Sequence, residues 1–356
     1  MEIRAFDQKL DLKKQRDLFK ECFPETIGTS LEKEDHYIWK FHSFPHSVKS
    51  YEYVTYDGYD MIGYYAALPY KYSINNSTYI VGMVCDVMTG IKARGKGVFT
   101  KMGIYSTDEM RNQGLAFTTG YPIRPEVIPG HIKAGWKKLF KLPLYINFIK
   151  GNKLLQSKNL GCFAFIFNII INLYNFGLKL LFPSPKVELE IYNISDIDEI
   201  KGFKEFIQKW QQEQVIYLHK STEFLKWRLG APDKQYKLHI ARKNDIIVGY
   251  AVSSFTIKEN VPSVVIIDLS FLNAYKKNIP YFIRKLKVYA KENNQESLMI
   301  MFSEFMTKKY KLLQCGFLKS PYKFWLILKQ FDSNIPSHII EDDANWHLGW
   351  IDSDNF

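Results

Sequence analysis

Cysteine is scarce in this sequence, and its spacing excludes two kinds of framework. The chain has 356 residues but four cysteines, Cys22, Cys85, Cys162 and Cys315, which lie far apart and form no C-x-x-C pair. Neither a disulfide framework nor a structural zinc site is indicated. The amino-terminal segment also lacks the apolar core of a secretory signal. We therefore expect a cytoplasmic protein in a reducing compartment, with no metal.

Sequence motifs for nucleic-acid binding are missing as well. The chain carries 48 Lys and Arg residues against 37 Asp and Glu residues, which gives a net charge of +11. Such an excess favours an anionic partner. The lysines are scattered, however, and neither a zinc-finger spacing nor an RNP-like aromatic box occurs. We expect a nucleotide, a phosphorylated cofactor or an acidic surface as the partner, and no nucleic acid.

One long apolar segment stands out in this otherwise ordinary composition. Residues 162–182 carry a single charge, Lys179, and are long enough to cross a bilayer. Asn168, Asn172 and Asn175 recur at helical spacing, so one face of the predicted helix is polar. We expect an amphipathic helix buried between two domains. Contact with a membrane surface and a transmembrane span are the alternatives.

The order of sequence patterns predicts a mixed α/β fold. The length favours two domains over one. In the first half, apolar and β-branched runs alternate with helical patterns. The expected elements are a strand at EIRAF, helices near 10–22 and 31–42, a hairpin near 51–72, a strand at YIVGMVCDVMT, a helix near 98–113 and a strand at AFTTGY.

The same order restarts after Pro185, which indicates an internal repeat. HYIWKFHSFP aligns with EFLKWRLGAP and brings Trp39 opposite Trp227, while DMIGYYA matches DIIVGYA and each half has a late Gly-aromatic pair. We infer two tandem domains over residues 1–145 and 186–356, joined by an apolar linker helix region over 146–185. Chance similarity between two α/β segments is the alternative.

The stretch VMTGIKARGKGVFTKM, residues 87–102, predicts an anion site. An apolar strand runs into a basic turn with glycines and then into a helix, whose first amides have no intrahelical acceptor. Gly95 and Gly97 permit close approach of the backbone, and Arg94 and Lys96 add charge. The G-x-G-x-x-G and Walker patterns are both absent, so this pattern alone leaves the phosphorylated ligand open.

RGKGVF after a strand ending in VMT resembles the acetyl-CoA pyrophosphate loop of the GNAT acetyltransferases. Arg94 and Gly97 match that pattern, and Phe99 replaces its final small residue. The resemblance extends over about residues 1–145 and implies acetyl-CoA as the co-substrate. The second-half turn, NAYKKNIPYF, has no glycine, so we expect the second domain to lack the cofactor loop. The residues assigned to the cofactor are Val87, Met88, Thr89, Arg94, Gly95, Lys96, Gly97, Val98, Phe99 and Thr100.

The resemblance also implies catalytic roles. In many GNAT enzymes a tyrosine four residues before the Gly-aromatic pair protonates the leaving thiolate, and His131 occupies that place here. Tyr121 is the substitute donor. Asp86 interrupts an apolar strand, where a carboxylate is costly unless it is used or paired, so it is the candidate base. A structural hydrogen bond is the alternative role for Asp86. Weaker candidates are Glu126 and His36.

The resemblance therefore implies an N-acetyltransferase acting on a small amine. We expect an amino sugar or a nucleotide-linked amino sugar as the acceptor. The alternatives are an aminoacyl transferase like the FemABX enzymes, which also double this fold, and a non-catalytic scaffold on a membrane surface. The aromatic tail, residues 345–356, is expected to dock across the domain cleft, where Asp352 and Asp354 could bind the amine; a disordered tail is the other possibility. The oligomeric state stays open.

Overall fold

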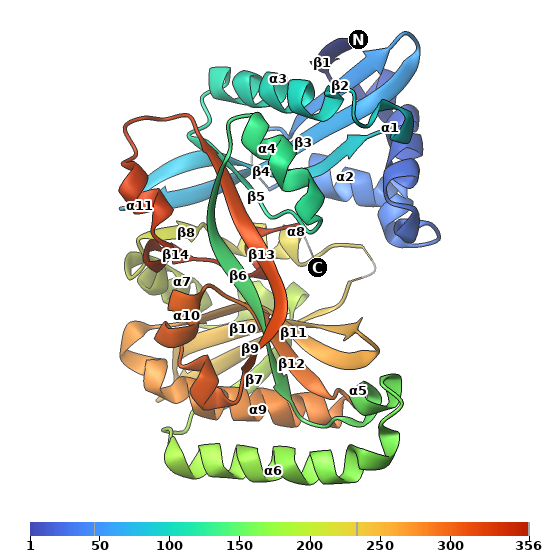
Figure 1. Ribbon diagram of the computed structural model, residues 1–356. Helices are drawn as coiled ribbons and strands as arrows, with labels where there is room; N and C mark the ends of the chain where they lie inside the picture. The colour runs from blue at the N-terminus through green and yellow to red at the C-terminus, as the bar shows by residue number, and fades with distance from the viewer. Residues whose placement is uncertain (46, 233, 355–356) are drawn as a thin grey trace.

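The computed structural model describes residues 1–45, 47–232 and 234–354. Its elements follow the predicted alternation of strands and helices (Figure 1). The first half contains β1 (Glu2–Ala5), α1 (Gln8–Cys22), α2 (Glu34–His42), β2 (Tyr51–Asp57), β3 (Asp60–Ile74), β4 (Ser77–Thr89), α3 (Val98–Asn112), β5 (Phe117–Gly120), α4 (Ile128–Lys133) and β6 (Lys137–Phe148).

Two helices, α5 (Asn152–Ser157) and α6 (Ala164–Leu181), connect the first half to the second. The second half then repeats the order of the first. It contains β7 (Glu188–Asn193), α7 (Phe203–Gln212), β8 (Ile216–Leu218), α8 (Thr222–Arg228), β9 (Tyr236–Lys243), β10 (Ile246–Lys258), β11 (Val261–Phe271), α9 (Ile279–Glu292), β12 (Ser297–Met301), α10 (Glu304–Lys309), β13 (Leu318–Gln330), α11 (Ser337–Glu341) and β14 (Trp346–His347).

One continuous mixed sheet joins the two halves. Its order is β1-β2-β3-β4-β5-β13-β6-β12-β11-β10-β9-β7, with β8 and β14 beside it. The halves are therefore mirrored in strand order, and each gives its last long strand to the other: β13 pairs with β5, and β6 pairs with β12. This arrangement confirms the predicted α/β class and the two similar halves. Strand β6 runs through residue 145, the predicted end of the first domain.

The tight turns of the sheet have a left-handed backbone, at asparagine in three of four positions. Asn75 and Asn76, between β3 and β4, have φ values of 48° and 68°. Glu259 and Asn260, at the equivalent turn between β10 and β11, have φ values of 51° and 63°. Two consecutive residues with positive φ form the turn that matches the twist of a β-hairpin. The same local geometry thus recurs in both halves.

The two tryptophans that the repeat aligns meet at the junction of the halves. Trp39 and Trp227 stack with ring centroids 5.6 Å apart and an interplanar angle of 19°. Each indole N–H donates to the backbone carbonyl oxygen of the other residue, at 2.8 and 2.9 Å. Such a reciprocal contact is expected at a pseudo-twofold axis, and it agrees with the inferred duplication.

The position predicted for the apolar helix was wrong. Helix α6 does not lie between the halves but covers the outer end of the second half, next to α9 (Figure 1). Within the described residues, the helical segment Gly161–Leu181 is long and apolar enough to cross a membrane, and only 6% of it is buried. Two of its three asparagines, Asn168 and Asn175, face inward and bond to the linker and to the second half, while Asn172 is exposed.

Candidate active site

The first half has an opening between two parallel strands. Strands β4 and β5 pair from Val81 with Phe117 to Val84 with Gly120, and the pairing stops there while β4 continues to Thr89. The last residues of β4 therefore border a gap in the sheet on the side of β5. An extended chain laid in such a gap can exchange hydrogen bonds with the exposed strand backbone.

A β-bulge shapes this end of β4. Cys85 pairs with Ala66 and Met88 with Tyr64, so Asp86 and Val87 together lie opposite Tyr65. Asp86 has φ 47°, a left-handed value that an L-residue rarely adopts. Bulges re-aim the backbone next to active sites. Here the bulge turns the amides around Val87 relative to the rest of the strand.

The predicted cofactor turn lies directly beyond the opening. Gly95 and Gly97 both have φ 77°, and a Cβ at either position would meet no atom within 4 Å. The backbone conformation, and not crowding, therefore favours glycine at both sites. The Arg94 guanidinium donates to the carbonyl oxygen of Thr89 at 3.2 Å, which ties the turn to the end of the strand.

The amino terminus of α3 is open to an anion. The first intrahelical bond runs from the Lys101 amide to the Gly97 carbonyl oxygen, so the amides of Val98, Phe99 and Thr100 precede it. No side chain of the described residues caps this end. Lys96 and Arg94 are exposed beside it. Free amides, the positive end of the helix dipole and two cations form a site suited to a phosphate group.

The second half has an equivalent opening, but it is filled. Strands β11 and β12 stop pairing at Ile266 with Ile300, while β11 continues to Phe271. The carboxy-terminal tail packs here, and a Cβ on Gly349 would lie 3.0 Å from the Ile267 carbonyl oxygen. The His347 imidazole lies 3.7 Å from the Asp268 carboxylate. The turn before α9 is a glycine-free helical turn, as predicted, with Pro280 in the first turn of α9.

Asp86 forms an ion pair at the opening of the first half. Its carboxylate accepts from the buried Lys40 ammonium at 2.9 Å, and Lys40 also donates to Asp354 of the tail at 2.9 Å. Burial opposes the charge on Asp86, but the Lys40 ammonium outweighs it, so the pKa of Asp86 is lowered. The thiol of Cys85 lies beside these two carboxylates, and Lys40 supplies the cation that they share.

The repeat helps to interpret this pair. Asp86 and Asp268 each lie two residues after the last β4–β5 or β11–β12 pair. Asp268 bonds the Lys220 ammonium at 2.8 Å, and both side chains are fully buried. A paired aspartate thus occurs in both halves, including the half whose opening is filled. This supports the structural role for Asp86, while its role as a base stays a prediction.

The two candidate proton donors, His131 and Tyr121, are both buried but differ in protonation. His131 is only 5% exposed, between the rings of Phe99 and Trp136. Burial lowers its pKa to about 4, so the imidazole is neutral near pH 7. Tyr121 follows β5 at the opening, and burial together with the Asp352 carboxylate raises its pKa well above the usual range. Tyr121 therefore keeps its proton at neutral pH.

The two weaker candidates lie in different surroundings. Glu126 is exposed in a short turn before α4. His36 packs against Trp39 on α2, and burial lowers its pKa to about 4. Lys40, one residue after Trp39, was missed by the sequence analysis. Its signal was present, since both aligned tryptophans are followed by a basic residue.

The tail docks across the junction, as predicted. Tyr72 of β3 donates to the buried Asp352 carboxylate at 2.7 Å. Burial raises the pKa of Asp352 to about 6. With Asp354 on Lys40, the tail runs from the opening of the second half to that of the first. Two carboxylates of the tail thus lie at the junction between the two openings.

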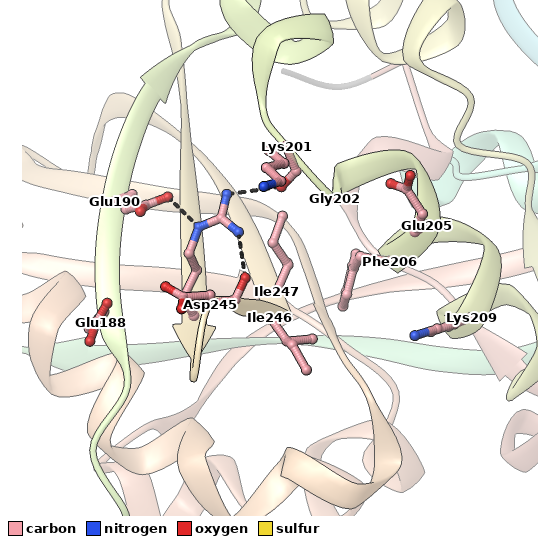
Figure 2. A pocket seen from close by; sticks show the side chains of 11 residues that line it. Glu188, Glu190, Lys201, Gly202, Glu205, Phe206, Lys209, Asp245, Ile246 and Ile247 are labelled. Carbon is pink, nitrogen blue, oxygen red and sulfur yellow. Dashed lines mark hydrogen bonds and ion pairs between the residues drawn. The ribbon is translucent and has the colours of Figure 1, made fainter.

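A separate cavity of about 470 Å³ lies on the second half, far from this opening in the sheet order. Figure 2 shows Glu190, Asp245 and Lys201 around its wall. The Arg242 guanidinium there donates to Glu190 at 2.7 Å and to the carbonyl oxygens of Asp245 and Lys201. The Arg242 guanidinium already donates hydrogen bonds to these partners, so we assign the cavity no part in the site.

Comparison with known proteins agrees with this geometry. The sequence pattern of the family described as acetyltransferase (GNAT) domain matches residues 2–137. No protein of curated function is similar in sequence. The fold resembles a GCN5-related N-acetyltransferase from Anabaena variabilis, with TM-score 0.62, 13% identity, and coverage of 93% of this chain and 73% of that one.

Two further solved structures share the fold. A probable N-acyltransferase from Enterococcus faecalis has TM-score 0.63 and 12% identity over 93% of this chain and 72% of its own. An N-myristoyltransferase from Saccharomyces cerevisiae, solved with bound myristoyl-CoA, has TM-score 0.61 and 12% identity over 92% of this chain and 77% of its own. In each case the likeness covers both halves.

Proposed function

We propose that the chain transfers the acetyl group of acetyl-CoA to a small amine, because residues 2–137 match the acetyltransferase (GNAT) domain family and the fold resembles that of a GCN5-related N-acetyltransferase. The observation that carries the proposal is the uncapped amino terminus of α3 directly after the unpaired end of β4. A strand gap suits the extended pantetheine arm, and the helix terminus suits the diphosphate. In the second half the tail packs in the equivalent gap, and α9 begins after a glycine-free turn with Pro280 in its first turn.

Residues of the turn would hold the cofactor. The amides of Val98, Phe99 and Thr100, with Arg94 and Lys96, would bind the diphosphate. The backbone from Val87 to Thr89 would bond the pantetheine arm, and an amide of this bulged segment would stabilise the oxyanion that forms when the amine attacks the thioester carbonyl.

The transfer itself needs few side chains. The neutral amine attacks the carbonyl carbon, a C–N bond forms, the C–S bond breaks, and the amine proton leaves to a base or to water. The departing thiolate takes a proton, and we assign Tyr121 as its donor. Asp86 and Asp354, bound by Lys40, would attract the ammonium form of an incoming amine to the opening.

We keep an amino sugar or a nucleotide-linked amino sugar as the proposed acceptor class. Its hydroxyl groups suit the polar cluster of Asp86, Lys40, Asp352 and Tyr72 at the junction. The choice of acyl group is part of the same proposal. The yeast neighbour was solved with myristoyl-CoA, so a longer acyl chain is the second candidate.

Calorimetry with acetyl-CoA, myristoyl-CoA and free CoA tests the cofactor. A coupled assay of thiol release over amino sugars, nucleotide-linked amino sugars, polyamines and aminoglycosides tests the acceptor. We expect acetyl-CoA to bind with micromolar affinity and an amino sugar to release thiol. Absence of binding by every CoA compound would remove the proposal and would favour the aminoacyl transferase or the scaffold. Preferred binding of myristoyl-CoA would replace acetyl by a long acyl group.

A further inference from the structure

Helix α6 turns two of its three asparagines inward, beside Ile171 and Leu178, and presents a wide apolar side outward. The Asn168 side chain accepts the Gly151 amide and donates to Asn152, and Asn175 accepts from the Lys287 ammonium. At 3.6 residues per turn, about half of the circumference opposite these asparagines is apolar. It consists of side chains that are 42% to 75% exposed: Phe165, Ile166, Ile169, Ile170, Leu173, Tyr174, Phe176, Leu180 and Leu181.

A helix on the surface of a water-soluble protein normally keeps its solvent-facing side polar. An exposed apolar band of this size marks an interaction site. The inward contacts also fix the orientation of α6, because a Cβ on Gly316 would lie 3.2 Å from Leu178 and 3.3 Å from Asn175. The apolar face is thus held outward by close packing on the other side.

Positive charge predominates around α6, although Glu292 follows Lys291 at the end of α9 and Glu296 accepts the Lys153 amide. Between Glu126 and Glu188 the sequence has no acidic residue at all. Arg284 and Lys291 on α9 lie one turn on either side of Lys287, which contacts α6. Five exposed lysines flank the helix or lie on it: Lys150, Lys153, Lys158, Lys179 and Lys186. This pattern complements a surface that is apolar within and anionic at its boundary.

The connections of α6 argue against a helix that crosses a bilayer. Strand β6 ends at Phe148, which pairs with Ser297, and β7 begins at Glu188, which pairs with Arg242. Both ends of the segment therefore return to the same sheet. A spanning helix would have to break these pairs or place its two ends on opposite sides of the membrane.

We propose that α6 lies flat on the surface of an anionic lipid membrane. Its apolar face enters the boundary of the acyl chains, and the flanking lysines contact the headgroup phosphates. This proposal is independent of the acyl transfer proposed above. In Figure 1, α6 lies at the end of the molecule opposite α1 and α3. The cofactor turn would then face away from the lipid and stay open to the aqueous phase.

Vesicle flotation of the full chain tests the proposal. Vesicles of equal parts phosphatidylglycerol and phosphatidylcholine should carry the protein upward, whereas pure phosphatidylcholine should carry much less. The double variant Ile166→Asn/Leu173→Asn should lower the partition coefficient at least tenfold. A matched control, Tyr59→Asn/Ile257→Asn, changes two side chains that are 92% and 72% exposed elsewhere, and should float like the wild type.

Substitution of the lysines gives a second, independent test of the proposal. Replacing Lys153, Lys158 and Lys179 by Gln should weaken binding to the anionic vesicles about fivefold per lysine, with an unchanged melting temperature. Failure of the wild type to float would overturn the proposal. So would a wild-type dimer that the Ile166→Asn/Leu173→Asn variant converts to a monomer, because the apolar face would then bind a second copy. Equal binding to both vesicle types would overturn the anionic part.

Discussion

Replacement of Gly97 by Asp should abolish most of the affinity for coenzyme A without unfolding the protein. Gly97 has φ 77° and open space around its Cβ position. Asn and Asp tolerate this left-handed conformation better than other L-residues, at a cost of about 1 kcal/mol. The fold should therefore survive, but the new carboxylate would stand where the diphosphate binds.

The magnitude follows from the charges involved. A carboxylate about 6 Å from one phosphate charge is repelled by about 2.8 kcal/mol at an effective dielectric constant near 20. Solvent exposure of the turn reduces this by about half. We expect an affinity for acetyl-CoA that is tenfold to a hundredfold weaker, measured by calorimetry at low and high salt. The difference should shrink as salt is added.

Two controls separate charge and position from backbone strain. Gly97→Asn places the same shape there without the charge, so it should bind more tightly than Gly97→Asp. Gly114, at the other end of α3, has φ 84° and equally open space, and Gly114→Asp should leave affinity unchanged. Equal affinity of Gly97→Asp and the wild type, or equal weakening by Gly114→Asp, would refute the assignment of the turn.

Four further outcomes are expected. Asp86→Asn should lower the free energy of unfolding by about 1–3 kcal/mol. It should also lower kcat with little change in the affinity for acetyl-CoA. A folded variant with unchanged kcat would leave Asp86 only a structural role. Tyr121→Phe should lower kcat at least tenfold while His131→Phe should not, and the reverse result would restore the histidine as donor. Deletion of residues 346–356 should lower both melting temperature and activity, and neither changing would exclude the docked tail. The pKa of Asp352 is raised to about 6 in the folded protein, so protonated Asp352 stabilises the fold below pH 4. This contribution to the free energy of unfolding, about 3 kcal/mol, is lost as the pH rises to 6. Chemical denaturation across this pH range should show a smaller loss of stability for Asp352→Asn, and an equal loss would contradict this.

The local features of the site were predictable, because they depend on neighbouring residues. The turn around Gly95 and Gly97 requires positive φ at both positions, and glycine is the residue that adopts positive φ most easily. The repeat was visible because Trp39 and Trp227 stand in matching patterns. The partner of Asp86 was not predictable to the same degree, since Lys40 comes from α2 and reaches the strand only in the folded chain.

The exchange of β6 and β13 had no sequence signal. A strand shows which of its faces is apolar, but the pattern does not say which neighbour it pairs with. Both β6 and β13 mix apolar residues with lysines and one proline, and this composition fits either half. The prediction for α6 failed for a related reason: the asparagines indicated a polar face and hence an amphipathic helix, but the pattern does not say where such a helix packs, and we expected it between the domains.

Comparison of the two halves distinguishes the features of the site that come from the sheet from those that come from the turn before the helix. Each has a bulged central strand, a gap after it, and an aspartate held by a lysine, Asp86 with Lys40 and Asp268 with Lys220. These shared features cannot by themselves decide which half binds a cofactor. The difference lies beyond the strand: one turn exposes helix amides beside two glycines, while the other enters its helix through Pro280, and the tail fills its gap. Restoring glycines to the second turn should therefore not create a second cofactor site unless the tail is removed as well.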